Sequence, residues 1–104
     1  MAFRLGDIID RTDCGSLSGM KREIACECWF TSDGKSIPRI IKVMDAEGML
    51  HTIREIFVVS SEEKMYAGIA TVEHLCDIRL RDRVERVKLV FTKESCRWVL
   101  VADF

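Results

Sequence analysis

Hydrophobic and polar residues alternate along the C-terminal part of the chain, most regularly between residues 72 and 81. Side chains two residues apart lie on the same face of an extended strand, so this period predicts a strand with one buried and one solvent-facing side. The predicted buried face carries Val72, His74, Cys76, Ile78 and Leu80, and the opposite face carries Glu73, Asp77, Arg79 and Arg81. Leu75 interrupts the alternation.

The same pattern predicts further strands, separated by turn-forming residues such as Asp33-Gly34 and Glu47-Gly48. Successive strands with short connections favour an antiparallel meander. We therefore predict a mainly β fold, a strongly bent antiparallel sheet or SH3-like, partly open barrel, with an open sheet and a five-strand Greek-key barrel as alternatives. The other predicted strands are Arg22–Thr31, Ile37–Asp45, Leu50–Ser60, Val84–Thr92 and Cys96–Ala102.

Two of these strands carry a local irregularity. Pro38 lacks the N–H that a central ladder needs, so its end of the strand should lie on an edge or at a strand terminus. Residues 50–60 place apolar side chains on both faces, which indicates either a bulge or cover from another element. After them, Ser60 and Glu63 have capping-box spacing and Gly68 is placed to stop a helix, so we predict a short helical turn near 61–67.

The chain has 104 residues, enough for one domain with a modest core. Residues 1–19 end in a Gly- and Ser-rich stretch and are predicted to be an N-terminal extension, a linker or a short helix, with an all-β domain over 20–104. Charged residues interrupt the N-terminus where a signal peptide would be apolar. We therefore expect a cytoplasmic protein, with no contact with a membrane.

Five cysteines without a regular spacing argue against a disulfide-stapled secreted domain. Cys26, Cys28 and Cys76 fall on predicted apolar faces, where a free thiol packs as a small hydrophobic group. The alternative is a zinc site that adds Cys96 and His74, but zinc ligands usually lie on turns rather than inside strands. We predict core packing for the thiols, no metal and no cofactor.

No Gly-rich phosphate loop, nucleophile elbow or helical metal motif occurs in the sequence. His74 lies on an apolar face, where a buried structural histidine is the more common case. We therefore predict no catalytic residue and no enzymatic activity. An enzyme is the third hypothesis, with Cys76 or His74 as its only chemistry.

The segment 77–97 holds seven basic residues against four acidic ones. A basic hairpin near Trp98 could bind single-stranded nucleic acid through phosphate contacts and base stacking. The more ordinary interpretation is a solvated sheet face with cross-strand ion pairs, because the net charge of the chain is −1. The residues of the nucleic-acid hypothesis are Arg79, Arg81, Arg83, Arg86, Lys88 and Arg97.

Trp29 falls on the polar face of its predicted strand, and an aromatic side chain there commonly marks a contact surface. Ile56 and Val58 lie opposite the predicted core face of residues 50–60 and form a second candidate surface. We therefore expect a small non-catalytic interaction module of unknown process. Its partner would be another protein or a second copy in a homodimer, and a nucleic-acid-binding accessory protein is the alternative.

Overall fold

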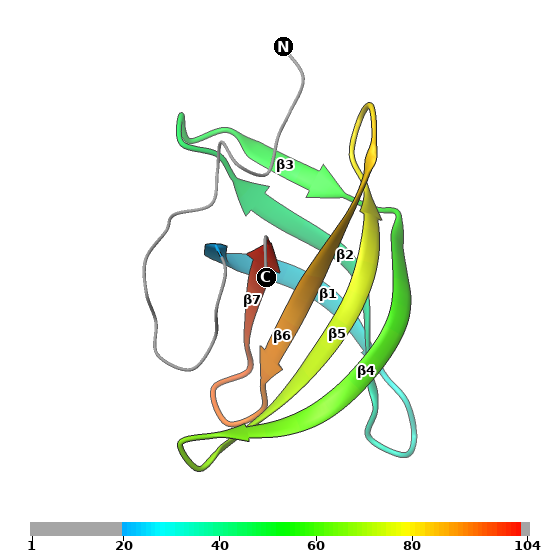
Figure 1. Cartoon of the computed structure of the whole chain (residues 1–104), viewed down its shortest axis with the longest axis vertical. Coiled ribbons are helices and arrows are strands. Elements are labelled where there is room, and N and C mark those ends of the chain that lie inside the picture. Colours follow the sequence, from blue (N-terminus) through cyan, green and yellow to red (C-terminus); the bar gives the residue numbers. More distant parts are fainter. Residues whose placement is uncertain (1–19, 103–104) are drawn as a thin grey trace.

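A computed structural model describes residues 20–102, which form one seven-stranded sheet in the order β3-β2-β1-β7-β6-β5-β4. All neighbouring strands are antiparallel, and the sheet curls into a half-barrel (Figure 1). The extension predicted for residues 1–19 lies outside the described residues. The strands are β1 Met20–Phe30, β2 Ser36–Met44, β3 Leu50–Ile53, β4 Ile56–Tyr66, β5 Ile69–Arg79, β6 Val84–Thr92 and β7 Arg97–Ala102.

The predicted mainly β, partly open barrel is confirmed, but the helical turn near 61–67 is wrong. The chain continues there as β4, which pairs with β5 up to Tyr66. Ala67 and Gly68 both have positive φ, 50° and 81°, as a two-residue hairpin turn requires. The ladder therefore outweighs the local capping signal of Ser60 and Glu63. No helix in residues 20–102 is long and apolar enough to cross a membrane.

The strand predicted over Leu50–Ser60 is in fact two strands with different partners. β3 pairs with β2, with Ile53 opposite Ile41, and after residues 54 and 55 the chain pairs with β5 instead. In Figure 1 the chain leaves β3, turns a corner and descends as β4. A bulge follows, because Val58 lies opposite Cys76 and Ser60 opposite Leu75. This bulge confirms one of the two explanations for apolar residues on both faces.

The core lies on the concave side of the sheet, where the alternating residues predicted for β5 are all buried. Trp98 is buried as well, and its ring lies 4.9 Å from that of Phe91, measured between centroids. Burying large side chains of this kind supplies most of the stabilisation of a small domain. The core cluster contains Ile41, Val43, Ile53, Cys76, Ile78, Leu80, Val87, Leu89, Phe91, Trp98, Leu100 and Ala102.

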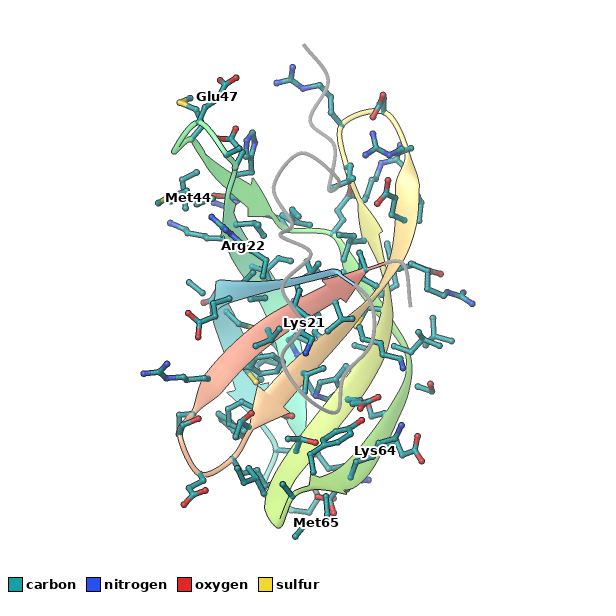
Figure 2. The ribbon with its side chains drawn as sticks, turned by 60° about the vertical axis from the view of Figure 1, so that its left-hand side comes forward. Lys21, Arg22, Met44, Glu47, Lys64 and Met65 are labelled. Carbon is teal, nitrogen blue, oxygen red and sulfur yellow. The ribbon has the colours of Figure 1, made fainter. Side chains whose placement is uncertain are left out.

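Besides the outer edge of the short terminal strand β3, two further stretches of strand edge matter here because they have no neighbouring strand in the described sheet. β3 covers β2 only from Ile41 to Met44, so the first half of β2, which contains Pro38, has no strand on that side. The position predicted for the proline, at a local edge, is confirmed. The second free edge belongs to β4, the last strand of the sheet. Figure 2 places Lys64 and Met65, near the end of β4, far from Met44 and Glu47 at the opposite end of the molecule.

Candidate functional site

The edge strand β4 exposes three consecutive apolar side chains, which we call the β4 patch. Phe57, Val58 and Val59 are 61%, 40% and 51% exposed. The bulge at Val59 explains their position. It interrupts the alternation of the strand, so three consecutive side chains reach the surface instead of alternating between core and solvent. Exposed apolar side chains on a long free edge are a feature that proteins usually avoid, because such an edge pairs with other chains.

The three contact residues predicted from the sequence do not form one surface. Val58 belongs to the β4 patch, whereas Ile56 is partly buried and packs against the core. Trp29 is 60% exposed, as its position in the pattern predicts, but it lies on β1, which is not a neighbour of β4. The guanidinium carbon of Arg39 lies 4.3 Å from the centre of the Trp29 ring, a cation–π contact.

Beside the β4 patch lies an open cavity of about 940 Å³, which we call the β2–β4 slot. Its two walls are the free edges described above. The β1–β2 hairpin and the start of β2 contribute Lys35, Ser36 and Ile37 to one wall, and the β4 wall carries Val58, Ser61, Glu62 and Glu63. Val72 and His74 of β5 also line the slot.

His74 connects the two walls of the slot. Its Nε2 lies 2.9 Å from Ser36 Oγ on β2, and its Nδ1 lies 2.6 Å from Ser61 Oγ on β4. The ring stacks on Trp98 with a centroid separation of 5.8 Å and is 1% exposed. Burial lowers the pKa of His74 below its usual value, so the imidazole is neutral at neutral pH. The predicted buried position of His74 is confirmed.

The two serines that contact His74 were not singled out by the sequence. Ser61 fell inside the predicted helical turn, where it would not lie opposite His74. Ser36 lay between the turn predicted at Asp33-Gly34 and the strand predicted from Ile37, and was assigned to neither. The signal that could have found Ser61 is the register of the β4–β5 ladder, which places it directly across from His74.

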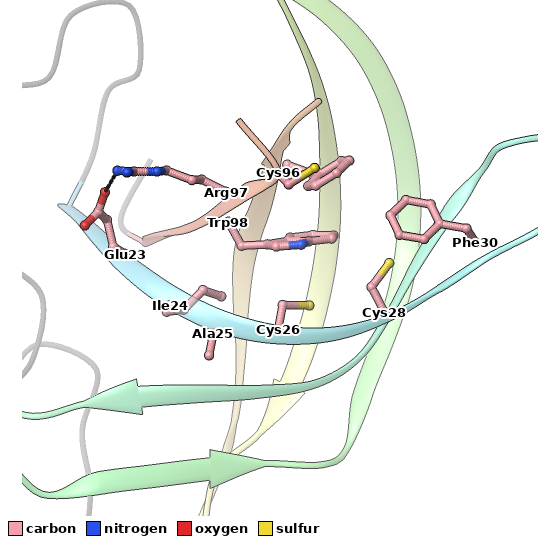
Figure 3. Close-up of a pocket in the computed structure, with 10 residues that line it drawn as sticks. Glu23, Ile24, Ala25, Cys26, Cys28, Phe30, Cys96, Arg97 and Trp98 are labelled. Atoms are coloured by element: carbon pink, nitrogen blue, oxygen red, sulfur yellow. Dashed lines mark hydrogen bonds and ion pairs between the residues drawn. The ribbon is translucent and has the colours of Figure 1, made fainter. Parts of the chain in front are cut away.

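A second cavity, of about 600 Å³, opens where β1 separates from β7 (Figure 3). The ring of Trp98 and the thiols of Cys26 and Cys28 line it, and Arg97 pairs with Glu23 at 3.5 Å beside them. Burial raises the pKa of Cys26 to about 12. This pKa makes the thiol a poor nucleophile, which agrees with the predicted packing role.

Cys76 is fully buried in the core, and burial raises its pKa to about 12 as well. Cys26 and Cys28 are partly buried and pack against the same core, so the prediction for these three thiols is confirmed. Cys96 is exposed. Among residues 20–102 no three His, Cys, Asp or Glu side chains are grouped as metal ligands.

Most of the basic residues of the nucleic-acid hypothesis have carboxylate partners. Arg86 donates two hydrogen bonds to Asp77, at 2.8 and 3.1 Å, across the β5–β6 ladder. The other ion pairs are Arg79 with Glu55, Arg83 with Asp82 and Glu85, Lys88 with Glu73, and Arg97 with Glu23, while Arg81 lines a third cavity with His51. This is the arrangement expected of a solvated sheet face.

Glu73 is the most enclosed carboxylate of that outer face. It accepts a hydrogen bond from the Tyr66 hydroxyl and forms ion pairs with Lys64 at 3.3 Å and Lys88 at 3.5 Å. Burial acts to raise the pKa of Glu73, but the hydrogen bonds from Tyr66 and Lys64 outweigh it, and the net pKa is lowered. Because Tyr66, Lys64 and Lys88 together compensate the negative charge of Glu73, we regard this cluster as structural rather than reactive.

No protein-family model, curated protein or solved structure matches the chain. The functional assignment therefore rests on the residues and geometry described above.

Proposed function

We propose that this protein is a small cytoplasmic interaction module whose contact surface is the β4 patch, and that its partner is a second copy of the chain. The observation that carries the proposal is the exposure of Phe57, Val58 and Val59 on a strand with a free edge. A second strand placed along this edge removes apolar area from water and satisfies backbone groups that otherwise bond only to solvent.

The residues of β4 are compatible with two-fold pairing of identical chains. When two copies run antiparallel about an axis at Val58, Phe57 of one copy lies opposite Val59 of the other. The same register places Ile56 of one copy opposite Ser60 of the other. A symmetric interface of this kind is self-complementary, because one patch serves both subunits. The adjacent ladder also has a bulge, which limits the pairing to a short segment.

Cysteine usage supports the assignment to the cytoplasm. The described thiols are all free, and Cys96 is exposed. An exposed free thiol persists most readily in a reducing compartment. Nucleic-acid binding is the weaker proposal, because five of the six basic residues in question already have carboxylate partners. Binding through phosphates would also weaken steeply with salt, whereas contact through the β4 patch would not.

The experiment that tests the proposal is light scattering on purified protein over a range of concentrations. We expect a dimer for the wild type and a monomer for Val58→Lys, because two lysines at the axis repel and cannot be desolvated. Leu50→Lys is the matched control: it makes the same change at a residue of β3 that is 54% exposed, and should leave the dimer intact.

Circular dichroism separates loss of pairing from loss of fold. Val58→Lys should keep the β-type spectrum of the wild type, since the side chain already reaches solvent. A wild type that stays monomeric at high micromolar concentration would contradict the proposal. A Leu50→Lys protein that loses the dimer would move the contact surface to β3.

A further inference from the structure

The β2–β4 slot contains three side chains arranged as a nucleophile, a base and a group that orients the base. Ser36 Oγ lies within hydrogen-bond distance of His74 Nε2, and His74 Nδ1 is held by Ser61 Oγ. In the tautomer protonated at Nδ1, the imidazole donates to Ser61 and accepts the hydroxyl proton of Ser36 at Nε2. This is the relation that activates a serine hydroxyl for attack on a carbonyl carbon.

The backbone of β2 adds a donor for the negative charge that such an attack creates. The N–H of Thr31 donates to the carbonyl of Lys35 at 2.8 Å, and the N–H of Lys35 donates to Thr31 Oγ1 at 3.0 Å, so the backbone groups of Lys35 face β1. In an antiparallel ladder the next residue, Ser36, then turns its N–H and C=O away from β1. Because β3 covers β2 only from Ile41 onward, the N–H of Ser36 is directed toward the slot. A backbone N–H at the nucleophile itself is a common oxyanion donor.

The slot also gives a substrate access while keeping the base dry. Ser36 and His74 both line the cavity, yet both are buried. The low pKa of His74 keeps its Nε2 free to accept a proton at neutral pH. The walls combine apolar Ile37, Val58 and Val72, which a small acyl chain can contact, with charged side chains of both signs. The charged residues are Asp33, Lys35, Glu62, Glu63 and Lys93.

We propose that Ser36 and His74 form a nucleophile–base pair that takes the acyl group of a small activated carboxylic ester. Ser36 Oγ forms a bond to the carbonyl carbon and its proton passes to His74 Nε2. The bond from that carbon to the leaving oxygen breaks, and the leaving group departs with the electron pair and the proton from His74. A water molecule then attacks the acyl carbon and gives a proton to His74 Nε2. The bond between that carbon and Ser36 Oγ breaks, His74 returns the proton to Ser36 Oγ, and the acid is released. Ser61 is a positioning residue. This activity goes beyond the interaction function and departs from the sequence-based expectation of a non-catalytic protein.

A fluorophosphonate is the probe, because it labels activated serines by the same attack, with fluoride as leaving group. We expect peptide mass spectrometry to locate one label on Ser36 in the wild type and none in Ser36→Ala. Ser60→Ala removes a neighbouring hydroxyl of β4 that is not directed at His74, so its labelling rate should equal that of the wild type. Ser36→Thr, which keeps a hydroxyl, should retain slower labelling and guards against an Ala variant that fails to fold.

The variants of His74 and Ser61 separate chemistry from packing. His74→Gln keeps two hydrogen-bonding groups but removes the base, and should slow labelling by about a hundredfold or more. Ser61→Ala should slow it by about tenfold and change the pH at which the rate is half-maximal, an effect a purely structural serine would not have. Wild-type protein that is labelled no faster than His74→Gln, or labelled only at residues other than Ser36, would overturn the proposal.

Discussion

β3 and β4 are adjacent in sequence but differ in almost every structural respect. β3 has four residues and pairs with β2, and its last side chain, Ile53, is buried in the core. β4 has 11 residues and pairs with β5, and most of its side chains are exposed. The change of partner at residues 54 and 55 closes one end of the half-barrel with β3. It leaves β4 as a long edge beside an open slot.

The difference distinguishes a sheet edge that resists pairing with another chain from one that favours it. A short edge strand such as β3 offers few backbone groups to another chain, which is one of the ways in which proteins avoid unwanted pairing. β4 has the opposite properties, since it is long and apolar at Phe57, Val58 and Val59. We therefore assign structural closure to β3 and contact to β4.

The largest expected effect contrasts a buried residue of β3 with an exposed residue of β4. Ile53→Ala leaves a cavity in the core and should lower the free energy of unfolding by about 2–5 kcal/mol. Val59→Ala removes a side chain that is already half in water and should change it by about 0.5 kcal/mol or less. Urea denaturation of the two variants measures both values. Measured at a protein concentration low enough for the monomer, similar losses for the two would mean that the chain itself covers β4.

The fold class could be predicted from the sequence because alternation has the period of the pleat. In β5 the predicted core face is buried, so the pattern alone indicated which side faces the core, and the predicted bounds of β6 are the observed ones. The method failed at β4. There a bulge shifts the alternation and the strand changes partner, and neither event leaves a periodic trace. Local capping residues then favoured a helix that the ladder with β5 overrides.

The candidate site could be predicted only in part, for the same reason. His74 and Val58 stood out by their place in the pattern. Ser36 and Ser61 become candidates only because they contact His74, which lies 38 residues from Ser36 and 13 residues from Ser61 along the sequence. Such contacts depend on how the half-barrel curls, which a single sequence does not specify.

A smaller expected effect is the pH dependence of the free energy of unfolding that comes from His74, which contacts Ser61 of β4. Because burial lowers the pKa of His74, the unfolded chain takes up a proton near pH 6.5 that the folded protein does not. The free energy of unfolding should therefore be unaffected by this group above pH 6.5 and fall as the pH drops below it. The pKa values of Glu73 and Asp77 are lowered, so these carboxylates contribute only at lower pH.

Urea midpoints of the wild type and His74→Gln between about pH 7 and pH 5.5 measure this contribution. The wild type should lose stability over this range, and the variant should lose less. An identical pH dependence in the two proteins would mean that His74 is hydrated in the folded protein.

The most direct test of the central claim, that β4 and not β3 is the contact edge, is amide hydrogen exchange followed by NMR at high and low protein concentration. We predict that raising the concentration slows exchange at amides of residues 56–60 and leaves residues 50–53 unchanged, because only this segment of the free edge of β4 gains partners in the dimer. The effect should be absent in Val58→Lys. Slower exchange at β3, or no dependence on concentration at either strand, would contradict the account.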